Sequence, residues 1–197
     1  QNYDLIQDAK PKVSKNSTGY LLWKVFDKKA NPFDLSKIFI GSQGTLGVIT
    51  EIKFRLVKTE KYSKMLVIYL DGISQLADIV NVVLKYNPTD FESYDDKTLK
   101  LALKFAPQIA RLISKETNIF KFGFLLLPDF WIMLKMGGFP KLVLMAEFKG
   151  NDVDEINKKI KELNIALLNK FHLYTHIPKK GDEEQKYWMI RRQSFNL

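Results

Sequence analysis

The order of apolar and polar residues divides the chain near residue 60 and predicts regular elements beyond that point. The run KMLVIYL at 64–70 is continuously apolar and rich in β-branched and aromatic residues, which is typical of a central strand. Apolar residues then recur at helical spacing from residue 73 to residue 84. The same criteria predict strands at 91–94, 141–148 and 172–177, and helices at 96–105, 153–171 and 182–195.

These predicted elements follow the order strand, helix, strand, insertion, strand, helix, strand. Two such halves are typical of a ferredoxin-like α+β domain, in which one antiparallel sheet carries helices on one face. We therefore expect an α+β domain at 61–197. The polar stretch at 58–64 is the expected boundary with a separate portion at 1–60.

The insertion between the two halves, Phe120 to Pro140, is the most hydrophobic stretch of the chain. A membrane-spanning helix needs about 20 nearly uninterrupted apolar residues, and Pro128, Lys135 and the glycine pair at 137–138 divide this stretch into shorter runs. Packing against the remainder of a larger protein is the favoured interpretation. The alternative is an interfacial helix pair whose apolar side chains enter the headgroup region of a membrane.

A short glycine-rich segment, GSQGTLGVIT at 41–50, is the main candidate for ligand contact. Glycine lacks Cβ, so it admits positive φ and lets the main chain approach a bound group closely. Glycine spacing alone also suits a bulge or a corner, and this spacing matches neither the phosphate loop nor the dinucleotide fingerprint. The candidate contact residues are Gly41, Ser42, Gln43, Gly44, Thr45, Gly47, Val48 and Ile49.

The residues on either side of this segment also carry a pattern. A turn at Asn31 and Pro32 precedes a short helical approach at 33–39. From Glu51 onward apolar and polar residues alternate, which places residues 52, 54 and 56 on one face. This alternation predicts a half-buried strand after the glycine loop.

Three segments together resemble the FAD-linked oxidases of the vanillyl-alcohol oxidase type. Residues 34–51, DLSKIFIGSQGTLGVITE, closely resemble the family motif that reads approximately D-L-x-x-L-F-x-G-S-E-G-T-L-G-I-I-T-E. The segment KNSTGY at 15–20 is similar to the family's K-N-x-x-G-Y element, and WMIRR at 188–192 is similar to the W-x-x-R element of its D-lactate and D-2-hydroxyacid dehydrogenase branch. One departure is Gln43 in place of the usual glutamate, which preserves shape and removes one negative charge.

The resemblance implies the cofactor FAD and a division of the chain into the C-terminal portion of an FAD-binding domain at 1–60 and a ferredoxin-like cap, or substrate, domain at 61–197. In addition to the loop residues at 41–49, it assigns Asn16, Gly19 and Tyr20 to the neighbourhood of the flavin. It also implies that a pyrophosphate loop lies upstream of Gln1 and a His-rich motif downstream of Leu197. The chain is then expected to be a fragment that is inactive alone and binds FAD weakly or not at all.

The resemblance further implies oxidation of D-lactate or a related D-2-hydroxyacid by hydride transfer to flavin. Arginine recognises a planar carboxylate through two parallel hydrogen bonds, and alignment on Trp188 selects Arg191 as the substrate contact, with Arg192 as a weaker candidate. The acidic residues Glu92, Asp95 and Asp96 could suggest paired carboxylates for acid/base chemistry, but a strand end that continues into a helix cap explains them more simply. No catalytic residue is assigned.

Composition limits the partners that the chain is expected to have. Its net charge of +9 is spread along the chain, with +4 in residues 1–60 and +5 in the remainder, so nucleic-acid binding is not expected. Cysteine is absent, which removes disulfides and thiolate chemistry. The expected partners are the 2-hydroxyacid, an electron acceptor of open identity and the rest of the parent chain. The expected location is cytoplasmic, with peripheral contact at the inner face of the membrane as an alternative.

The two histidines, His172 and His176, invite a metal hypothesis that the sequence does not support. A metal site needs a third ligand and second-shell carboxylates, and the surrounding residues favour a strand, so no metal is predicted. The competing hypothesis for the whole chain is a ferredoxin-like binding or membrane-docking module without catalysis, in which the glycine loop is only a turn.

Overall fold

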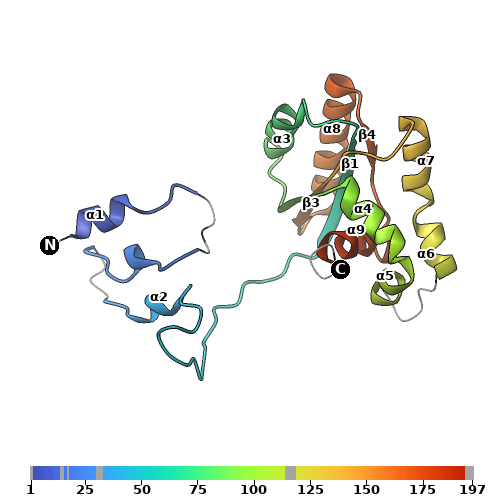
Figure 1. Ribbon diagram of the computed structural model, residues 1–197. Coiled ribbons are helices and arrows are strands. Elements are labelled where there is room, and N and C mark those ends of the chain that lie inside the picture. The colour runs from blue at the N-terminus through green and yellow to red at the C-terminus, as the bar shows by residue number, and fades with distance from the viewer. Residues whose placement is uncertain (1, 14–15, 17, 30–32, 114–118, 194–197) are drawn as a thin grey trace. The chain divides into compact units, whose positions relative to one another are not determined.

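The computed structural model describes residues 2–13, 16, 18–29, 33–113 and 119–193. The chain divides into two compact units, Gln1–Val57 and Lys58–Leu197, and each is described by itself. The larger unit contains every strand of the described residues, and it is shown on the right of Figure 1.

A four-stranded antiparallel sheet forms the centre of the larger unit. Its order is β2-β3-β1-β4, and every neighbouring pair is antiparallel, as the ferredoxin-like order of elements predicts. The α+β class is therefore confirmed. The strands are β1 (Tyr62–Leu70), β2 (Asp90–Asp95), β3 (Leu142–Gly150) and β4 (Tyr174–His176).

Helices cover both faces of this sheet, and the expectation of helices on one face was wrong. One face packs on α3 (Leu76–Leu84) and α8 (Val153–Phe171), and the other packs on the helices between 96 and 136 together with α9 (Asp182–Gln193) (Figure 1). The physical reason is visible in β1, where successive residues from Met65 to Leu70 are all buried. A continuous apolar strand needs cover on both sides. The helices of this unit are α3 (Leu76–Leu84), α4 (Asp96–Lys104), α5 (Ala106–Ile113), α6 (Ile119–Leu125), α7 (Leu127–Met136), α8 (Val153–Phe171) and α9 (Asp182–Gln193).

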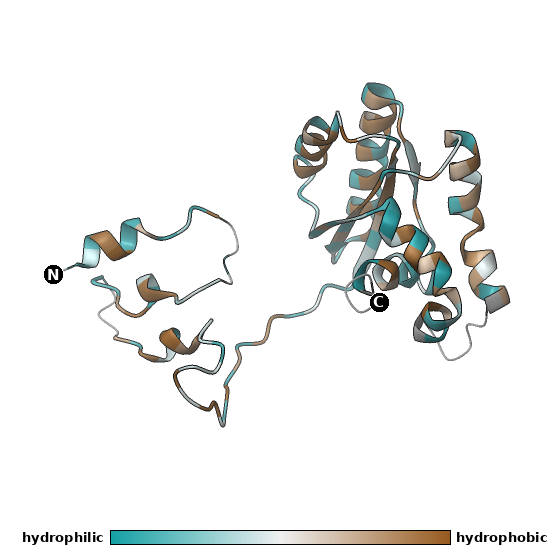
Figure 2. Cartoon of the chain, viewed as in Figure 1, coloured by the Kyte–Doolittle hydropathy of each residue, from teal (hydrophilic) through white to brown (hydrophobic). Residues whose placement is uncertain are grey.

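Helix α8 shows how local sequence sets an element. The side chain of Asp152 accepts hydrogen bonds from the backbone N–H groups of Asp154 and Glu155, which satisfies donors at the helix start. Its hydrophilic and hydrophobic residues alternate along the helix (Figure 2), because one side faces the sheet and the other faces solvent. The helix ends at Phe171 and is followed by the C-cap residue His172, which adopts the left-handed conformation with φ of 54°.

A buried polar network attaches the insertion to the rest of the larger unit. The hydroxyls of Tyr69 and Tyr187 donate to Asp129 Oδ1 at 2.6 and 3.0 Å. Lys186 Nζ, which is fully buried, donates to Asp129 Oδ2 and, at 2.6 Å, to the carbonyl oxygen of Leu125. Burial, and then the charge of Asp129, raise the pKa of both phenols well above the ordinary value. The network therefore joins β1, α6, α7 and α9.

The smaller unit contains short helices and loops. Its elements are α1 (Tyr3–Asp8), the 3-10 turn η1 (Leu22–Lys24) and α2 (Ser36–Phe39), and the last of these confirms the predicted helical approach to the glycine loop. The predicted strand from Glu51 to Leu56 was wrong. These residues form no strand, and Leu56 is 89% exposed. A strand needs a hydrogen-bonded neighbour, and the described part of this unit offers only the isolated bridge between Phe26 and Phe33.

Candidate functional site

The glycine loop is a tight structure in which several residues have left-handed backbone angles. Gly41, Gly44 and Gln43 have φ of 82°, 78° and 52°. At Gly41 an added Cβ would lie 2.3 Å from the carbonyl oxygen of Gly19, so no side chain fits there. The two segments that carry the cofactor resemblance therefore touch each other through glycine backbone.

A hydrogen-bonded chain holds the same two segments together. The hydroxyl of Thr45 donates to the carbonyl oxygen of Ser42 at 2.6 Å. Because this uses the only proton of that hydroxyl, Tyr20 is the donor in the 3.1 Å bond between its hydroxyl and Thr45 Oγ1. Ser42 is the buried residue of this loop. Tyr20 thus supports the loop from the upstream segment, and Thr45 supports it from within the loop.

The outer surface of the loop presents main chain and apolar side chains to solvent. Nothing lies within 4 Å of the position that a Cβ would take on Gly44, and Val48 and Ile49 are exposed. Exposed backbone beside apolar side chains suits a ligand with both a polar chain and a flat ring system. The loop therefore leaves these groups accessible to a bound molecule.

Asn16 has a local structural role. Its Oδ1 accepts a hydrogen bond from the backbone N–H of Thr18 at 3.0 Å, a side-chain turn that leads the chain into Gly19. Gly19 itself has φ of 71°. Both residues shape the support beneath the loop.

Arg191 lies in the larger unit and is held by an acidic partner. Its Nε donates to Glu92 Oε2 at 2.8 Å, which links α9 to β2. Arg192 is exposed. The bond to Glu92 fixes the orientation of the Arg191 guanidinium. Sequence reasoning selected Arg191 but assigned Glu92 to the end of a strand. The neighbouring Asp95 does cap α4, because its side chain accepts from the N–H of Thr98.

A polar cluster continues from this pair along the sheet, and sequence reasoning did not identify it. Ser63 donates to Glu147 at 2.6 Å and lies 3.4 Å from Glu184, while Lys149 forms ion pairs with Glu147 and Asp90 at 2.7 and 2.9 Å. Burial, and then Glu147, raise the pKa of Glu184, and hydrogen bonds to Glu147 and Asp90 raise the pKa of Lys149. One sequence signal could have indicated this cluster: Glu147 and Lys149 lie two residues apart at the end of an apolar strand, which places both side chains on the same face of the sheet.

The two histidines lie on different elements. His172 ends α8, and His176 lies in β4 with its Nε2 2.8 Å from Glu183 Oε1. Burial opposes ionisation of Glu183, but hydrogen bonds from the Lys179 backbone and from His176 outweigh it and lower the pKa of Glu183. Among the described residues, no group of three or more His, Cys, Asp or Glu side chains is arranged to hold a metal ion.

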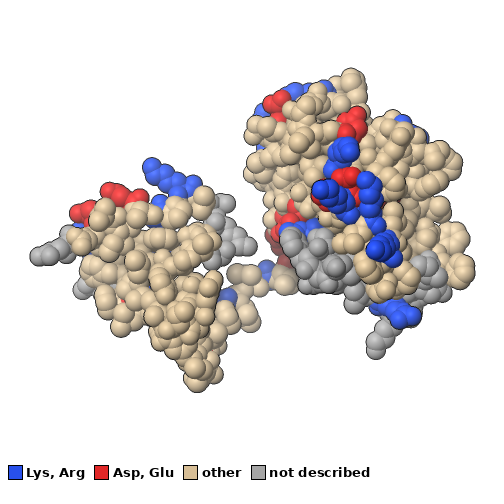
Figure 3. All heavy atoms as spheres, in the orientation of Figure 1, with Lys and Arg blue, Asp and Glu red and all other residues tan. Residues whose placement is uncertain are grey.

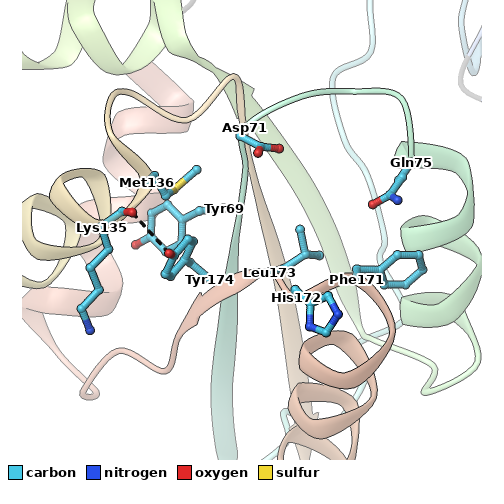
Figure 4. Close-up of a pocket in the computed structure, with 9 residues that line it drawn as sticks. All are labelled: Tyr69, Asp71, Gln75, Lys135, Met136, Phe171, His172, Leu173 and Tyr174. Carbon is cyan, nitrogen blue, oxygen red and sulfur yellow. Dashed lines mark hydrogen bonds between the residues drawn. The ribbon is translucent and has the colours of Figure 1, made fainter.

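A separate cavity of about 310 Å³ lies where β1 and β4 meet the ends of α7 and α8 (Figure 4). Asp71 and His172 line it from different loops, and the Tyr174 hydroxyl donates to the carbonyl oxygen of Lys135 at 3.3 Å. The Lys135 side chain extends away from the other lining residues (Figure 4). None of the predicted site residues lines this cavity.

Comparison with known proteins supplies relatives for part of the chain. It is 31% identical over 102 residues to D-2-hydroxyglutarate dehydrogenase of Escherichia coli (strain K12), which is 52% of this chain and 10% of that protein. It is 44% identical over 52 residues, 26% of this chain and 9% of the relative, to the mitochondrial D-lactate dehydrogenase [cytochrome] of Arabidopsis thaliana. It is 33% identical over 76 residues, 38% of this chain and 16% of the relative, to glycolate oxidase subunit GlcD of Bacillus subtilis (strain 168). No protein-family model matches the chain.

A solved structure shares the fold. Alkyldihydroxyacetonephosphate synthase superposes with a TM-score of 0.53 at 17% identity, covering 81% of this chain and 29% of that one. The chain thus matches about a tenth of the length of its dehydrogenase relatives and under a third of the structural neighbour. These findings confirm the resemblance that the glycine loop indicated: the chain is similar in sequence to part of D-2-hydroxyglutarate and D-lactate dehydrogenases, and its fold is similar to part of a larger solved protein.

Proposed function

We propose that this chain is one part of an FAD-dependent oxidoreductase that oxidises a D-2-hydroxyacid, with D-2-hydroxyglutarate and D-lactate as candidate substrates. The observation that carries the proposal is the glycine loop, because its sequence resembles the family's cofactor motif and its backbone packs closely against Gly19, with a hydrogen bond from Tyr20. The named relatives support the substrate class.

In the proposed reaction, FAD held by residues 41–49 would supply the acceptor for a hydride from the α-carbon of the substrate. The segment 41–49 of this chain binds the cofactor through backbone and hydroxyl groups. Arg191 binds the substrate carboxylate. Glu92 orients the Arg191 guanidinium by accepting the 2.8 Å hydrogen bond from its Nε. A general base takes the hydroxyl proton as the carbonyl forms, and no residue of this chain is assigned to that step.

The first experiment uses the product of the complete reading frame. We expect it to purify with bound flavin and to reduce a dye acceptor with D-2-hydroxyacids but not with their L-enantiomers. The 197-residue chain alone is expected to bind FAD weakly and to lack this activity. A complete protein without flavin, or without activity on any D-2-hydroxyacid, contradicts the proposal.

The glycine loop is tested by Gly41→Ala in the complete protein. The new Cβ would meet the Gly19 carbonyl at 2.3 Å, so we expect the flavin content to fall by at least about tenfold, the effect of 1.4 kcal/mol. The matched control is Gly72→Ala, where a Cβ has no atom within 4 Å. Equal flavin content in the two variants would show that the loop does not hold the cofactor.

The arginine is tested by Arg191→Lys, with Arg192→Lys as the control on the same helix. Loss of a charge-assisted hydrogen bond costs about 1.5–3 kcal/mol, so we expect kcat/KM to fall by about 10- to 150-fold in the first variant and to change little in the second. Flavin content should stay the same in both, because neither residue belongs to the proposed cofactor loop. If the two variants behave alike, Arg191 is not the carboxylate contact.

A further inference from the structure

Helices α6 and α7 expose an unusual amount of apolar surface. Trp131 is 60% exposed and Phe120 is 78% exposed. Other large apolar side chains of the same two helices are exposed as well. Contiguous exposed apolar patches usually mark an interaction site. We call this set the α6–α7 apolar face, and it consists of Phe120, Phe124, Leu127, Phe130, Trp131, Leu134 and the adjoining Phe139.

An apolar groove of about 400 Å³ adjoins this face. It runs between α4 and α7, and its wall is almost entirely apolar. The one charged residue of its lining, Asp129, is engaged by Lys186 and by two tyrosines. The groove therefore offers its occupant hydrocarbon contact rather than hydrogen bonds. Its apolar lining residues include Leu99, Leu103, Leu126, Leu127, Phe130, Met133 and Phe139.

Helix α4, which forms one wall of the groove, also carries exposed lysines, of which Lys100 pairs with Asp96 at 2.7 Å. Lys97, Lys100 and Lys104 are exposed at positions i, i+3 and i+7 of α4, which places them on one face of that helix. The ammonium of Lys100 lies 5.6 Å from the ring centroid of Phe139, at the rim of the groove. Figure 3 shows lysine and arginine side chains gathered over this part of the larger unit, beside a mainly uncharged surface over α6 and α7.

We propose that the α6–α7 apolar face and the lysines of α4 form a docking surface for an anionic lipid bilayer. Aromatic and leucine side chains would enter the boundary between headgroups and acyl chains, and Lys97, Lys100 and Lys104 would bind lipid phosphates. Exposed tryptophan, phenylalanine and leucine bordered by lysine suit a membrane interface with anionic lipids. This docking is peripheral, because no helix among the described residues is long and apolar enough to cross a bilayer.

The proposal does not depend on flavin chemistry and is tested by vesicle co-sedimentation. The 197-residue chain and the complete protein are each mixed with vesicles of phosphatidylcholine alone or with added phosphatidylglycerol. We expect both proteins to bind the anionic vesicles at least about tenfold more tightly, and binding to weaken in high salt. Equal binding to the two vesicles, or no binding, overturns the proposal.

Two sets of variants locate the surface. The first set, Trp131→Ser with Phe130→Ser, removes exposed apolar contacts. The second set replaces Lys97, Lys100 and Lys104 by glutamine, and each lost charge should lower the affinity for anionic vesicles about fivefold. The matched controls lie on α8, where Ile165→Ser removes an exposed apolar side chain and the pair Lys158→Gln with Lys161→Gln removes exposed lysines. If the controls weaken binding as much as the variants, the assigned surface is wrong.

Vesicle binding by the complete protein distinguishes a membrane surface from a surface that another part of the protein covers. If the 197-residue chain binds anionic vesicles but the complete protein does not, then the rest of that protein covers the face and the proposal fails. Size-exclusion chromatography adds a second check: a chain that self-associates, and becomes monomeric when Trp131 and Phe130 are replaced, would identify the face as a protein interface instead.

Discussion

The two units of this chain use apolar residues in different ways. In the larger unit, strand residues such as Leu66 and Val67 are completely buried between helical layers. In the described part of the smaller unit, the buried residues are Leu21, Val25 and Ser42, while Val48 and Phe54 remain exposed. Both regions contain apolar residues at regular spacing. The difference shows that the spacing of apolar residues predicts an apolar face of a strand or helix, whereas a neighbouring strand and a covering helix are needed to bury that face.

The largest expected difference concerns amide hydrogen exchange. Residues 65–70 lie in a paired, buried strand, so they should exchange only through opening of the larger unit. Residues 51–57 form no regular structure and should exchange at least about a thousandfold faster. Comparable protection of the two segments in the 197-residue chain would remove the contrast between the units.

The buried network of the larger unit should be sensitive to loss of one partner. Asp129→Ala leaves the fully buried ammonium of Lys186 without its carboxylate, so we expect the free energy of unfolding to fall by about 3–5 kcal/mol in denaturant titration. The control Asp154→Ala removes an exposed acid from the start of α8 and should cost less than about 1 kcal/mol. Replacing the pair together, with Asp129→Leu and Lys186→Met, should recover part of the loss, because the buried ammonium is removed while one of the two phenol hydroxyls loses its acceptor.

Matched leucine truncations compare the two units directly. Leu163→Ala removes a fully buried side chain of α8 and should lower the stability of the larger unit by about 2–5 kcal/mol. Leu21→Ala affects the smaller unit, and we expect the unfolding transition of the larger unit to remain within about 0.5 kcal/mol of the parent. A large shift of that transition in Leu21→Ala would show that the two units unfold as one.

The smallest expected effects have opposite signs in two neighbouring glutamates. Folding raises the pKa of Glu184, so its favourable contribution is present below pH 4.5, the ordinary value, and is lost as pH rises through the folded pKa. Glu184→Gln should therefore be slightly more stable than the parent at pH 7 and equal to it near pH 4. Folding lowers the pKa of Glu183, so its contribution is present above pH 4.5 and is lost as pH falls through the folded pKa.

Glu183→Gln should accordingly be slightly less stable than the parent at pH 7, with the difference shrinking in acid. Because both side chains are partly exposed, each effect should stay within about 0.5 kcal/mol. Thermal unfolding at several pH values measures both. Effects of the same sign in the two variants would contradict the assigned surroundings of these carboxylates.

Much of the larger unit could be predicted because its elements carry strong local signals. Helix 153–171 was predicted with its observed bounds, since Asp152 caps its start and its apolar residues repeat at helical spacing. The second helical layer was missed because the pattern of 120–140 does not reveal where that segment packs. Asp129 illustrates the problem: within an apolar insertion it resembles an interruption, yet it anchors α7 to Lys186 on a helix nearly 60 residues later.

The candidate site was predicted in part for the same reason. The glycine loop and Arg191 carry motifs that can be identified in isolation. Glu92, Glu147 and Lys149 gain meaning only when the sheet brings their strands together. The contact between Gly19 and Gly41 also required the structure, because the two glycines lie far apart in sequence and touch through backbone atoms.

Local order along the chain was enough to establish the α+β class, the four strands and the helices α3, α4, α8 and α9 of the larger unit, and the resemblance to FAD-linked oxidases, since each depends on spacing and short motifs. Tertiary structure alone decided which faces are buried, which carboxylates pair with which cations, and that the alternating segment after the glycine loop forms no strand. The physical reason is that burial and charge pairing depend on neighbours distant in sequence. An alternating segment such as 51–56 becomes a strand only where another strand accepts its hydrogen bonds.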